Sequence, residues 1–371
     1  MLGNFSPSNQ YKEKALAKRA ALDIKATTIN GDRKIHWISK DSQGSIAQEP
    51  PTPPPRHKSS NNATAIPELK QHGAQRGPPG TVPIALSNLD YLDHPGSRKQ
   101  APNSTTFESK RQYSGDHWYS SSTQYVSNLG GSADFSLFSP YVANTNDFSL
   151  LQTLVGRTTD VPKWHTLEAG WINYPIQIAE AHLFTYFTTC QYTCYGDYLG
   201  GYNTDVKGWV QTSDTIFPGT VFTPSVDGGT QYELEILTYL YQDNWWVWVQ
   251  DGYIGYYPAS IWSNANNGAN GTLADGADSI FYYGEVYQSE DALTTTDMGN
   301  GEFGASNGFG KAAYIHNMQY FDTNSVAQDY TAGFWDSDDS RYNFQNTVSS
   351  GGSWGSYVYL GGPGAEGIVG G

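Results

Sequence analysis

Residues 232–249 read YELEILTYLYQDNWWVWV, which is two strand-like runs separated by the turn-forming residues Gln, Asp and Asn. In both runs aromatic and β-branched residues recur in the manner that is typical of β-strands. Other runs of the same character cover residues 135–138, 148–155, 183–187, 208–211, 279–283, 312–316 and 356–360. About a dozen short strands joined by tight turns predict an all-β fold, either an antiparallel β-sandwich or a jelly roll.

The composition of the 371-residue chain agrees with this fold class. Aromatic residues make up 14% and glycine occurs 40 times, whereas charged residues reach 15%, against about 25% in a typical soluble domain. Leu- and Ala-rich stretches are scarce beyond residue 20, which argues against a helical bundle or a doubly wound α/β fold. No apolar run approaches the roughly 18 residues that a membrane span needs, so no span is expected.

The first 115 residues differ in character from the rest of the chain. They contain a basic helix candidate at 1–20, a proline run at 49–55, and strand candidates at 34–38 and 81–84. A segment of this composition cannot bury a core of its own. We therefore predict a largely irregular N-terminal segment over residues 1–115, either disordered or draped over a β-sandwich domain at residues 116–371.

These two parts carry opposite charge. Residues 1–115 have 16 Lys or Arg and 9 Asp or Glu, a balance of +7, whereas residues 116–371 have 5 and 27, a balance of −22, which together give −15. An acidic body so poor in cations does not neutralise a phosphate backbone, so nucleic acid is not expected as a partner. Its self-repulsion at neutral pH is relieved in acid, which favours a protein that works at low pH.

Cys190 and Cys194 are the two cysteines of the chain. A zinc site lacks ligands because there is no second pair and no nearby histidine. The simplest interpretation is a disulfide across a small loop, formed in an oxidising compartment. Secretion is also favoured by glycosylation sequons, at Asn4, Asn62, Asn103 and Asn270. We therefore expect a secreted protein, although the N-terminal stretch lacks the apolar core of a signal peptide.

Two glutamates stand out because they interrupt apolar strands. In HTLEAGW, strand alternation places Glu168 and Gly170 on one face, where the glycine leaves room for a ligand backbone. In FYYGEVY, Glu285 shares its face with Tyr283 and Tyr287. A carboxylate in such a strand loses its hydration unless it has a partner or a function. For either glutamate taken alone, a solvent-facing strand position is the commoner explanation.

Ten motifs follow one another along the body of the chain. They are DFSLLQTLV (147–155), EAGW (168–171), FTYFTTCQYTC (184–194), GWVQ (208–211), DNWWVWV (243–249), IGYYP (254–258), YGEV (283–286), MGNGEFG (298–304), KAAYIHN (311–317) and WGSYVYLGGPG (354–364). In order and in detail they resemble the neprosin family, the plant-type glutamic endopeptidases. The stretch PPGTVPI (78–84), with the proline run before it, resembles the activation segment of that family.

The resemblance implies an antiparallel β-sandwich peptidase for which no cofactor and no metal are expected. The two catalytic glutamates of the family map to Glu168 in EAGW and Glu285 in YGEV, and its cysteine loop maps to Cys190 and Cys194. One glutamate would take a proton from water, and the other would donate a proton to the peptide carbonyl. The less crowded neighbourhood of Glu168 favours it as the base.

The resemblance also implies peptide or protein substrates, with cleavage on the C-terminal side of proline as the family preference. Tyr283 stands where the family usually has glycine, which narrows the groove beside Glu285. Aromatic residues that suit either the wall of a proline pocket or the hydrophobic core are Trp245, Trp246, Tyr256 and Tyr257.

The basic N-terminal segment is, by the same resemblance, an inhibitory propeptide. Its positive charge predicts docking on the acidic body at neutral pH and release in acid, followed by a cut between about residues 100 and 120. Two other classes also fit a β-sandwich with two carboxylates. One is a glycoside hydrolase, whose carboxyl groups lie about 5–5.5 Å or 6.5–9.5 Å apart, and the other is a non-catalytic carbohydrate- or protein-binding module.

Overall fold

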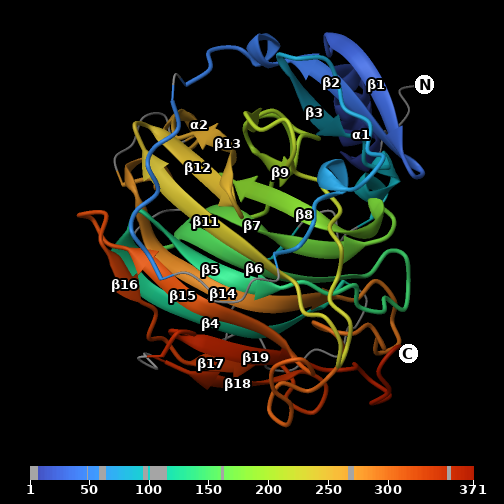
Figure 1. Ribbon diagram of the computed structural model, residues 1–371, viewed down its shortest axis with the longest axis vertical. Coiled ribbons are helices and arrows are strands. Elements are labelled where there is room, and N and C mark those ends of the chain that lie inside the picture. The colour runs from blue at the N-terminus through green and yellow to red at the C-terminus, as the bar shows by residue number, and fades with distance from the viewer. Residues whose placement is uncertain are drawn as a thin grey trace.

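The computed structural model describes residues 7–47, 49–57, 64–94, 99–100, 115–159, 163–265, 271–348 and 352–371. Two antiparallel sheets pack face to face in a β-sandwich, which confirms the predicted fold class (Figure 1). A smaller sheet from the N-terminal segment lies at one end of the sandwich. The four sequons and residues 101–114, which hold most of the expected processing region, lie outside the described residues.

Seven described strands form the sheet that carries both glutamates. They are β4 (His117–Asn128), β6 (Phe148–Arg157), β7 (His165–Tyr174), β8 (Ile178–Thr188), β9 (Gly200–Tyr202), β14 (Ala277–Tyr287) and β17 (Phe334–Asp336). Their order across the sheet is β17-β4-β14-β6-β7-β8-β9. Strand β6 therefore lies between the two strands that hold Glu168 and Glu285.

Nine described strands form the second sheet. They are β5 (Gly130–Ser136), β10 (Val210–Gln211), β11 (Glu233–Tyr241), β12 (Asn244–Val249), β13 (Gly252–Pro258), β15 (Ala313–Phe321), β16 (Ala327–Asp329), β18 (Asn343–Thr347) and β19 (Tyr357–Gly361). Their order is β10-β13-β12-β11-β5-β15-β19-β18, with β16 beside β15. The short helix α2 (Ser260–Ala265) follows β13. Neither α2 nor any other described helix is long and apolar enough to cross a membrane.

The hydrophobic core lies between the two sheets. Trp171 on β7 reaches across it, and its indole nitrogen donates to the carbonyl oxygen of Ser136 on β5 at 2.8 Å. Leu151 on β6 is the register partner of Trp171 and shares its inward face. Side chains of the opposite alternation point away from the second sheet, and Glu168 and Glu285 are among them.

The N-terminal segment contributes a helix and a small sheet that rest on the sandwich. Its elements are α1 (Pro7–Ala20), β1 (Ile24–Asn30), β2 (Arg33–Ser39), β3 (Thr81–Ala85) and the 3-10 helices η1 (Lys40–Gln43), η2 (Glu68–Lys70) and η3 (Leu89–Asp93). The strand candidates of the sequence are β2 and β3, which pair with each other. Ile35 and Trp37 pack against Phe217 of the sandwich. The segment is therefore draped over the body, and the rest of it is largely irregular.

Replacing Leu151 by alanine tests the core of the sandwich. A Leu→Ala change at a buried site costs about 2–5 kcal/mol because apolar burial is lost and a cavity remains, and Leu151 is 0% exposed. We expect the free energy of unfolding, measured in denaturant, to fall by that amount. Tyr125→Ala, at a position that is 65% exposed, is the matched control and should change it by less than about 0.5 kcal/mol. Equal losses in the two variants would contradict the placement of Leu151.

Candidate active site

Glu168 and Glu285 lie on the same outer face of the seven-stranded sheet. Glu168 on β7 is opposite Leu154 of β6, and Glu285 on β14 is opposite Leu150 of the same strand. Because side chains two and four positions apart on a strand share a face, both carboxylates emerge on one side of the sheet. Both are completely buried, at 0% exposure.

A cation from the N-terminal segment lies between these two carboxylates. Lys99 Nζ is 3.0 Å from Glu168 Oε2 and 3.2 Å from Glu285 Oε2, and the lysine side chain is itself fully buried. The ammonium also donates to the side-chain oxygen of Gln152 on β6. The Lys99 ammonium thus bridges Glu168 on β7 and Glu285 on β14, two strands that are not neighbours in the sheet.

Three uncharged donors hold the carboxylate of Glu168. Gln152 Nε2 donates to Oε2 at 2.8 Å, while the hydroxyls of Thr166 and Tyr192 donate to Oε1 at 2.9 and 2.8 Å. Burial and then the charge of Glu168 raise the pKa of Tyr192 well above its usual value, so its hydroxyl keeps the proton that it donates. The buried carboxylate is therefore satisfied by hydrogen bonds as well as by the ammonium.

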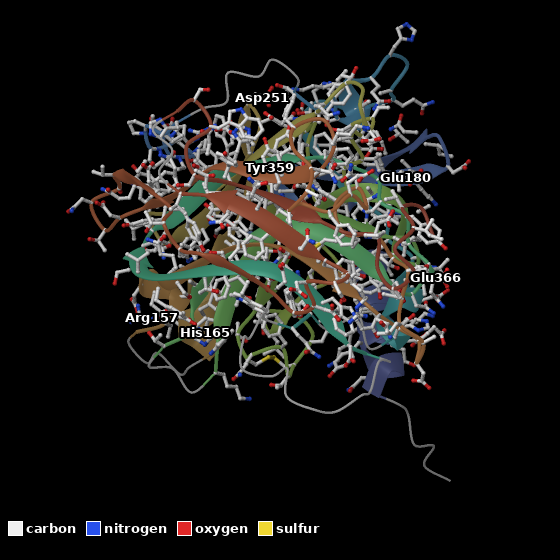
Figure 2. The ribbon with its side chains drawn as sticks, turned by 90° about the horizontal axis from the view of Figure 1, so that it is seen from below. Arg157, His165, Glu180, Asp251, Tyr359 and Glu366 are labelled. Atoms are coloured by element: carbon white, nitrogen blue, oxygen red, sulfur yellow. A yellow bond between two sulfur atoms is a disulfide. The ribbon has the colours of Figure 1, made fainter. Side chains whose placement is uncertain are left out.

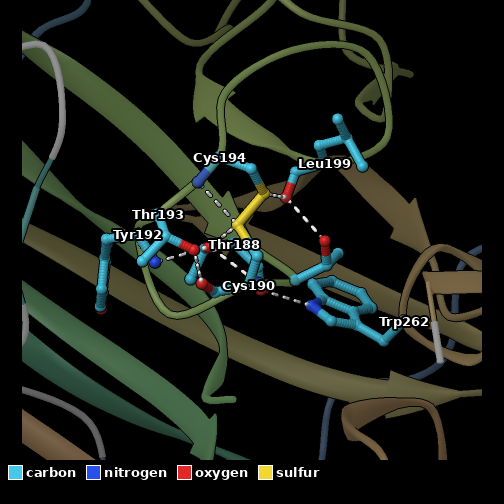
Figure 3. Close-up of a disulfide and its surroundings, with 8 residues drawn as sticks. Thr188, Cys190, Tyr192, Thr193, Cys194, Leu199 and Trp262 are labelled. Carbon is cyan, nitrogen blue, oxygen red and sulfur yellow. Dashed lines mark hydrogen bonds between the residues drawn. A yellow bond between two sulfur atoms is a disulfide. The ribbon is translucent and has the colours of Figure 1, made fainter.

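The predicted disulfide between Cys190 and Cys194 is present, and it closes the loop that carries Tyr192 (Figure 3). The backbone amides of Cys190 and Tyr192 donate to the hydroxyl of Thr188 at 3.2 and 3.1 Å. Tyr192 has a φ of 60°, in the left-handed region that residues other than glycine rarely adopt. The closed loop therefore holds a strained turn that directs the phenol at Glu168.

The carboxylate of Glu285 is held by a histidine on the neighbouring strand β4. Nδ1 of His117 is 2.6 Å from Glu285 Oε1. The imidazole packs against the rings of Phe148 and Tyr287, whose centroids are 5.9 and 4.9 Å away. Burial raises the pKa of Glu285, whereas the Lys99 ammonium and the bonded His117 lower it, and the resulting pKa lies below the usual value of 4.5.

Comparison with known proteins shows the family of this chain. The family model described as Neprosin matches residues 145–363, more than half of the chain. The chain belongs to the neprosin family. It is a peptidase of the glutamic type. This finding sets aside the two alternatives from the sequence, a glycoside hydrolase and a non-catalytic binding module.

Two solved structures of peptidases also align with this neprosin-family chain. One is scytalido-glutamic peptidase with a peptide-based transition-state analogue, at 8% identity and a TM-score of 0.32. The other is SCP-B, a member of the eqolisin family, in a complex with the tripeptide Ala-Ile-His, at 8% identity and a TM-score of 0.31. Each alignment covers 67% of this chain and 98% of the other.

Gly170 of this neprosin-family peptidase does not leave open space for a ligand backbone, contrary to the expectation from the sequence. A Cβ at this position would lie 2.1 Å from the carbonyl oxygen of Leu151 and 2.6 Å from Cβ of Gln152. The glycine is needed because β6 and β7 approach closely here. The amide of Gln152 instead joins the two sides of the site, since it donates to both Glu168 and Tyr283.

Tyr283 is the predicted substrate-binding residue that the structure places beside the glutamates. Its ring centroid is 5.7 Å from Lys99 Nζ, and that of Phe184 on β8 is 4.9 Å from the same atom. Burial, followed by the charges of both glutamates, raises the pKa of Tyr283 well above its usual value. The ammonium therefore lies between two aromatic rings as well as between two carboxylates.

The four other predicted aromatic residues belong to the second sheet of this neprosin-family fold. Trp245 and Tyr257 lie in the main hydrophobic core between the sheets. Trp246 and Tyr256 pair across β12 and β13 on the outer face of that sheet, where residues of the N-terminal segment cover them. The structure therefore places all four apart from the face that carries the glutamates.

Reasoning from the sequence missed five residues of this site, namely Lys99, His117, Gln152, Thr166 and Tyr192. Gln152 and Tyr192 lie inside two of the motifs, DFSLLQTLV and FTYFTTCQYTC, where a polar side chain within an apolar strand or a closed loop was an available signal. Lys99 had no such signal, because nothing in its local sequence relates it to a strand.

Replacing Tyr192 by phenylalanine tests whether the disulfide loop positions Glu168. The change removes one donor and keeps the ring, and a hydrogen bond to a charged group contributes about 1.5–3 kcal/mol. We expect kcat/KM of the processed peptidase to fall about 10- to 100-fold. Tyr198→Phe, in the neighbouring loop at a position that is 55% exposed, is the matched control. An unchanged rate in Tyr192→Phe would rule out a positioning role.

Proposed function

We propose that the chain is an acid-acting endopeptidase in which Glu168 and Glu285 activate the water that cleaves the peptide bond. The observation that supports the pair most directly is the single ammonium of Lys99, which lies within 3.2 Å of both carboxylates. Two carboxylates so placed do not readily ionise together once the cation leaves, so the pair then holds one proton. One member is left as a base and the other as an acid.

The proposed reaction uses these two protonation states in turn. The ionised glutamate removes a proton from water, whose oxygen attacks the carbonyl carbon, and the protonated glutamate donates to the carbonyl oxygen. Collapse of the tetrahedral intermediate breaks the C–N bond, and the leaving nitrogen takes the proton that the first glutamate had removed from water. A hydroxyl of the intermediate returns its proton to the second glutamate, so a carboxylic acid and an amine are released and the pair regains its starting protonation. Each positioned group contributes about 10²–10⁴ in rate. Glu168 suits the base, because its three uncharged donors stay in place without Lys99.

The N-terminal segment inhibits the enzyme in the same proposal. Lys99 fills the space between the carboxylates that water and the substrate carbonyl would need. The hydroxyl of Tyr119 donates to the backbone oxygen of Gln100 at 3.2 Å and fixes the next residue of the segment. The full chain is therefore latent until this segment leaves the site.

Further ion pairs join the basic segment to the acidic body. They are Arg19 with Asp205 at 2.7 Å, Arg56 with Glu235 at 2.5 Å, and Lys70 with Asp251 at 2.7 Å. Asp251 lies at the surface, where such a pair contributes little (Figure 2). The side chain of Arg56, by contrast, is 2% exposed and that of Asp205 is 3% exposed. These contacts support the docking that the opposite charges of the two parts predict.

Acid weakens the contact between the segment and the glutamates. Lys99 and His117 hold the pKa of Glu285 below 4.5 in the latent chain. The stabilisation from this ion pair is therefore complete above pH 4.5 and is lost as the pH falls through the lower pKa of the bound state. The other titratable groups around Lys99 and Glu285 are Glu168, Tyr119 and Tyr283. Because the pKa of Glu285 is lowered in the latent chain, acid favours release of the N-terminal segment.

Two finer features belong to the proposal. Cleavage after proline is supported by the rings of Phe184 and Tyr283, which flank the position of Lys99 Nζ, because aromatic walls suit a pyrrolidine ring. Secretion is supported by the disulfide between Cys190 and Cys194, because such bonds persist in oxidising compartments.

Glutamine substitutions test the catalytic pair. We expect Glu168→Gln and Glu285→Gln each to abolish acid-optimal hydrolysis of a proline-containing quenched peptide, measured from pH 2 to 8 after acid processing, with a loss of at least about 10²-fold. Glu366→Gln, at an exposed position near the C-terminal end, is the matched control and should leave the rate of the processed enzyme unchanged. Mapping the cut by mass spectrometry tests the preference for proline. Full activity in either active-site variant would remove that residue from the pair.

Substitution of Lys99 tests latency separately. We expect unprocessed Lys99→Gln chain to hydrolyse the same peptide at least about tenfold faster than unprocessed wild type at pH 5, because a charge-assisted contact to two carboxylates is lost. The intact N-terminus is verified by mass spectrometry in the same sample. Lys70→Gln, which removes a surface ion pair of the same segment, is the control. If Lys99→Gln stays as inactive as Lys70→Gln, inhibition does not depend on this lysine.

A further inference from the structure

Residues 45–47 and 49–57 of the N-terminal segment cross the outer face of the nine-stranded sheet, on the side of the sandwich away from the glutamates. At one end the amide of Ala47 donates to the hydroxyl of Tyr256 on β13 at 2.9 Å. At the other end the amide of His57 donates to Gln319 Oε1 on β15 at 2.9 Å. Because β12, β11 and β5 lie between these strands, the residues from 49 to 56 run across them (Figure 1).

A continuous aromatic strip lies on that outer face, and we define it as Tyr256, Trp246, Tyr253 and Trp248. Neighbouring ring centroids along it are 4.6, 5.5 and 5.2 Å apart. Four large rings on the outside of a sheet form an apolar surface of a kind that soluble proteins seldom leave uncovered. Ile46 and Ala47 pack against its Trp246 and Tyr256 end.

The proline run bears the burial pattern of a polyproline II helix. Pro51 and Pro54 are buried, whereas Thr52 and Pro55 are exposed. A spacing of three matches the three residues per turn of that helix, so one edge of the run faces the protein. Aromatic-lined grooves bind such helices because the ligand is already extended and loses little entropy.

Arg56, the residue after the prolines, places its positive charge against the carboxylate of Glu235 and the ring of Trp248, and we call these two side chains its pocket. The side chain of Arg56 is 2% exposed, its Nη2 is 2.5 Å from Glu235 Oε1, and its guanidinium lies 5.2 Å from the ring centroid of Trp248. Trp248 Nε1 in turn lies 3.3 Å from Glu235 Oε2 and 2.7 Å from the carbonyl oxygen of Gln250, so the pocket is held in shape by its own contacts. A buried cation between a carboxylate and an indole ring is a selective contact.

We propose that this surface is a docking site for proline-rich segments of protein substrates with the pattern Pro-x-x-Pro-x-Arg. The aromatic strip takes the two prolines, and the pocket of Glu235 and Trp248 takes the arginine. Residues 51–56, which read PTPPPR, occupy the site within the latent chain. Its use by substrates rests on the proposed release of the N-terminal segment, whereas binding itself does not require catalysis.

A binding experiment on the full chain tests this site without any peptidase activity. The probe is a fluorescent peptide with the sequence of residues 49–57, EPPTPPPRH, titrated in fluorescence anisotropy against chains that carry Glu285→Gln to prevent cleavage. A tethered ligand competes at a high effective concentration. We therefore expect the peptide to bind a chain with Pro51→Ala, Pro54→Ala and Arg56→Ala at least tenfold more tightly than a chain with its own segment intact.

Substitutions in the pocket and in the probe complete the test. In the triple variant, adding Glu235→Gln or Trp248→Ala should weaken binding at least tenfold, as should replacing the arginine of the peptide by alanine. Tyr125→Ala on the other sheet is the matched aromatic control and should change nothing. Thermal melting followed by circular dichroism establishes that each variant is folded, and Glu235→Gln is conservative. The proposal would be overturned if the peptide did not bind the triple variant. It would also be overturned if neither Glu235→Gln nor the loss of the peptide arginine changed the affinity.

Discussion

The face of the sheet that carries Glu168 and Glu285 depends on one buried interaction, the ammonium of Lys99 between their carboxylates. Two carboxylates that are fully buried on one face of a sheet lose their hydration and repel each other. A single cation compensates both of them. The N-terminal segment therefore completes the electrostatics of the site that it covers, and a shared proton is the simplest replacement once the cation has gone.

The geometry of the sheet explains why so few residues are needed to build this arrangement. Strand β6 separates the two glutamate-bearing strands, and Gln152 at its centre contacts Lys99, Glu168 and Tyr283. The close approach at Gly170 sets this central amide in place. A rigid strand framework with one polar residue in the middle holds a buried polar network in a fixed geometry, which a loop would do less well.

The same N-terminal segment contacts both outer faces of the sandwich. Lys99 reaches the glutamates on one face, while the proline run and Arg56 cross the other. Each contact places a basic side chain of the segment against carboxylates of the body, in keeping with balances of +7 and −22 for the two parts. Ion pairs to carboxylates weaken as the carboxylates take up protons, so in the proposed activation a fall in pH acts on the contacts of the segment with both faces.

The sequence by itself determined the all-β fold class, many of the strands, the residues that share a face with each glutamate, the disulfide candidate and the charge of the two parts, because period-two alternation and composition are local properties. It also carried the family motifs that single out Glu168 and Glu285. The tertiary structure decided that Lys99, His117 and Gln152 meet these glutamates. No local sequence pattern encodes these side-chain contacts, because they arise from strand pairing and from the path of a segment far away in the chain. For the same reason the four aromatic residues of β12 and β13 proved to lie in the core and on the outer face of the second sheet.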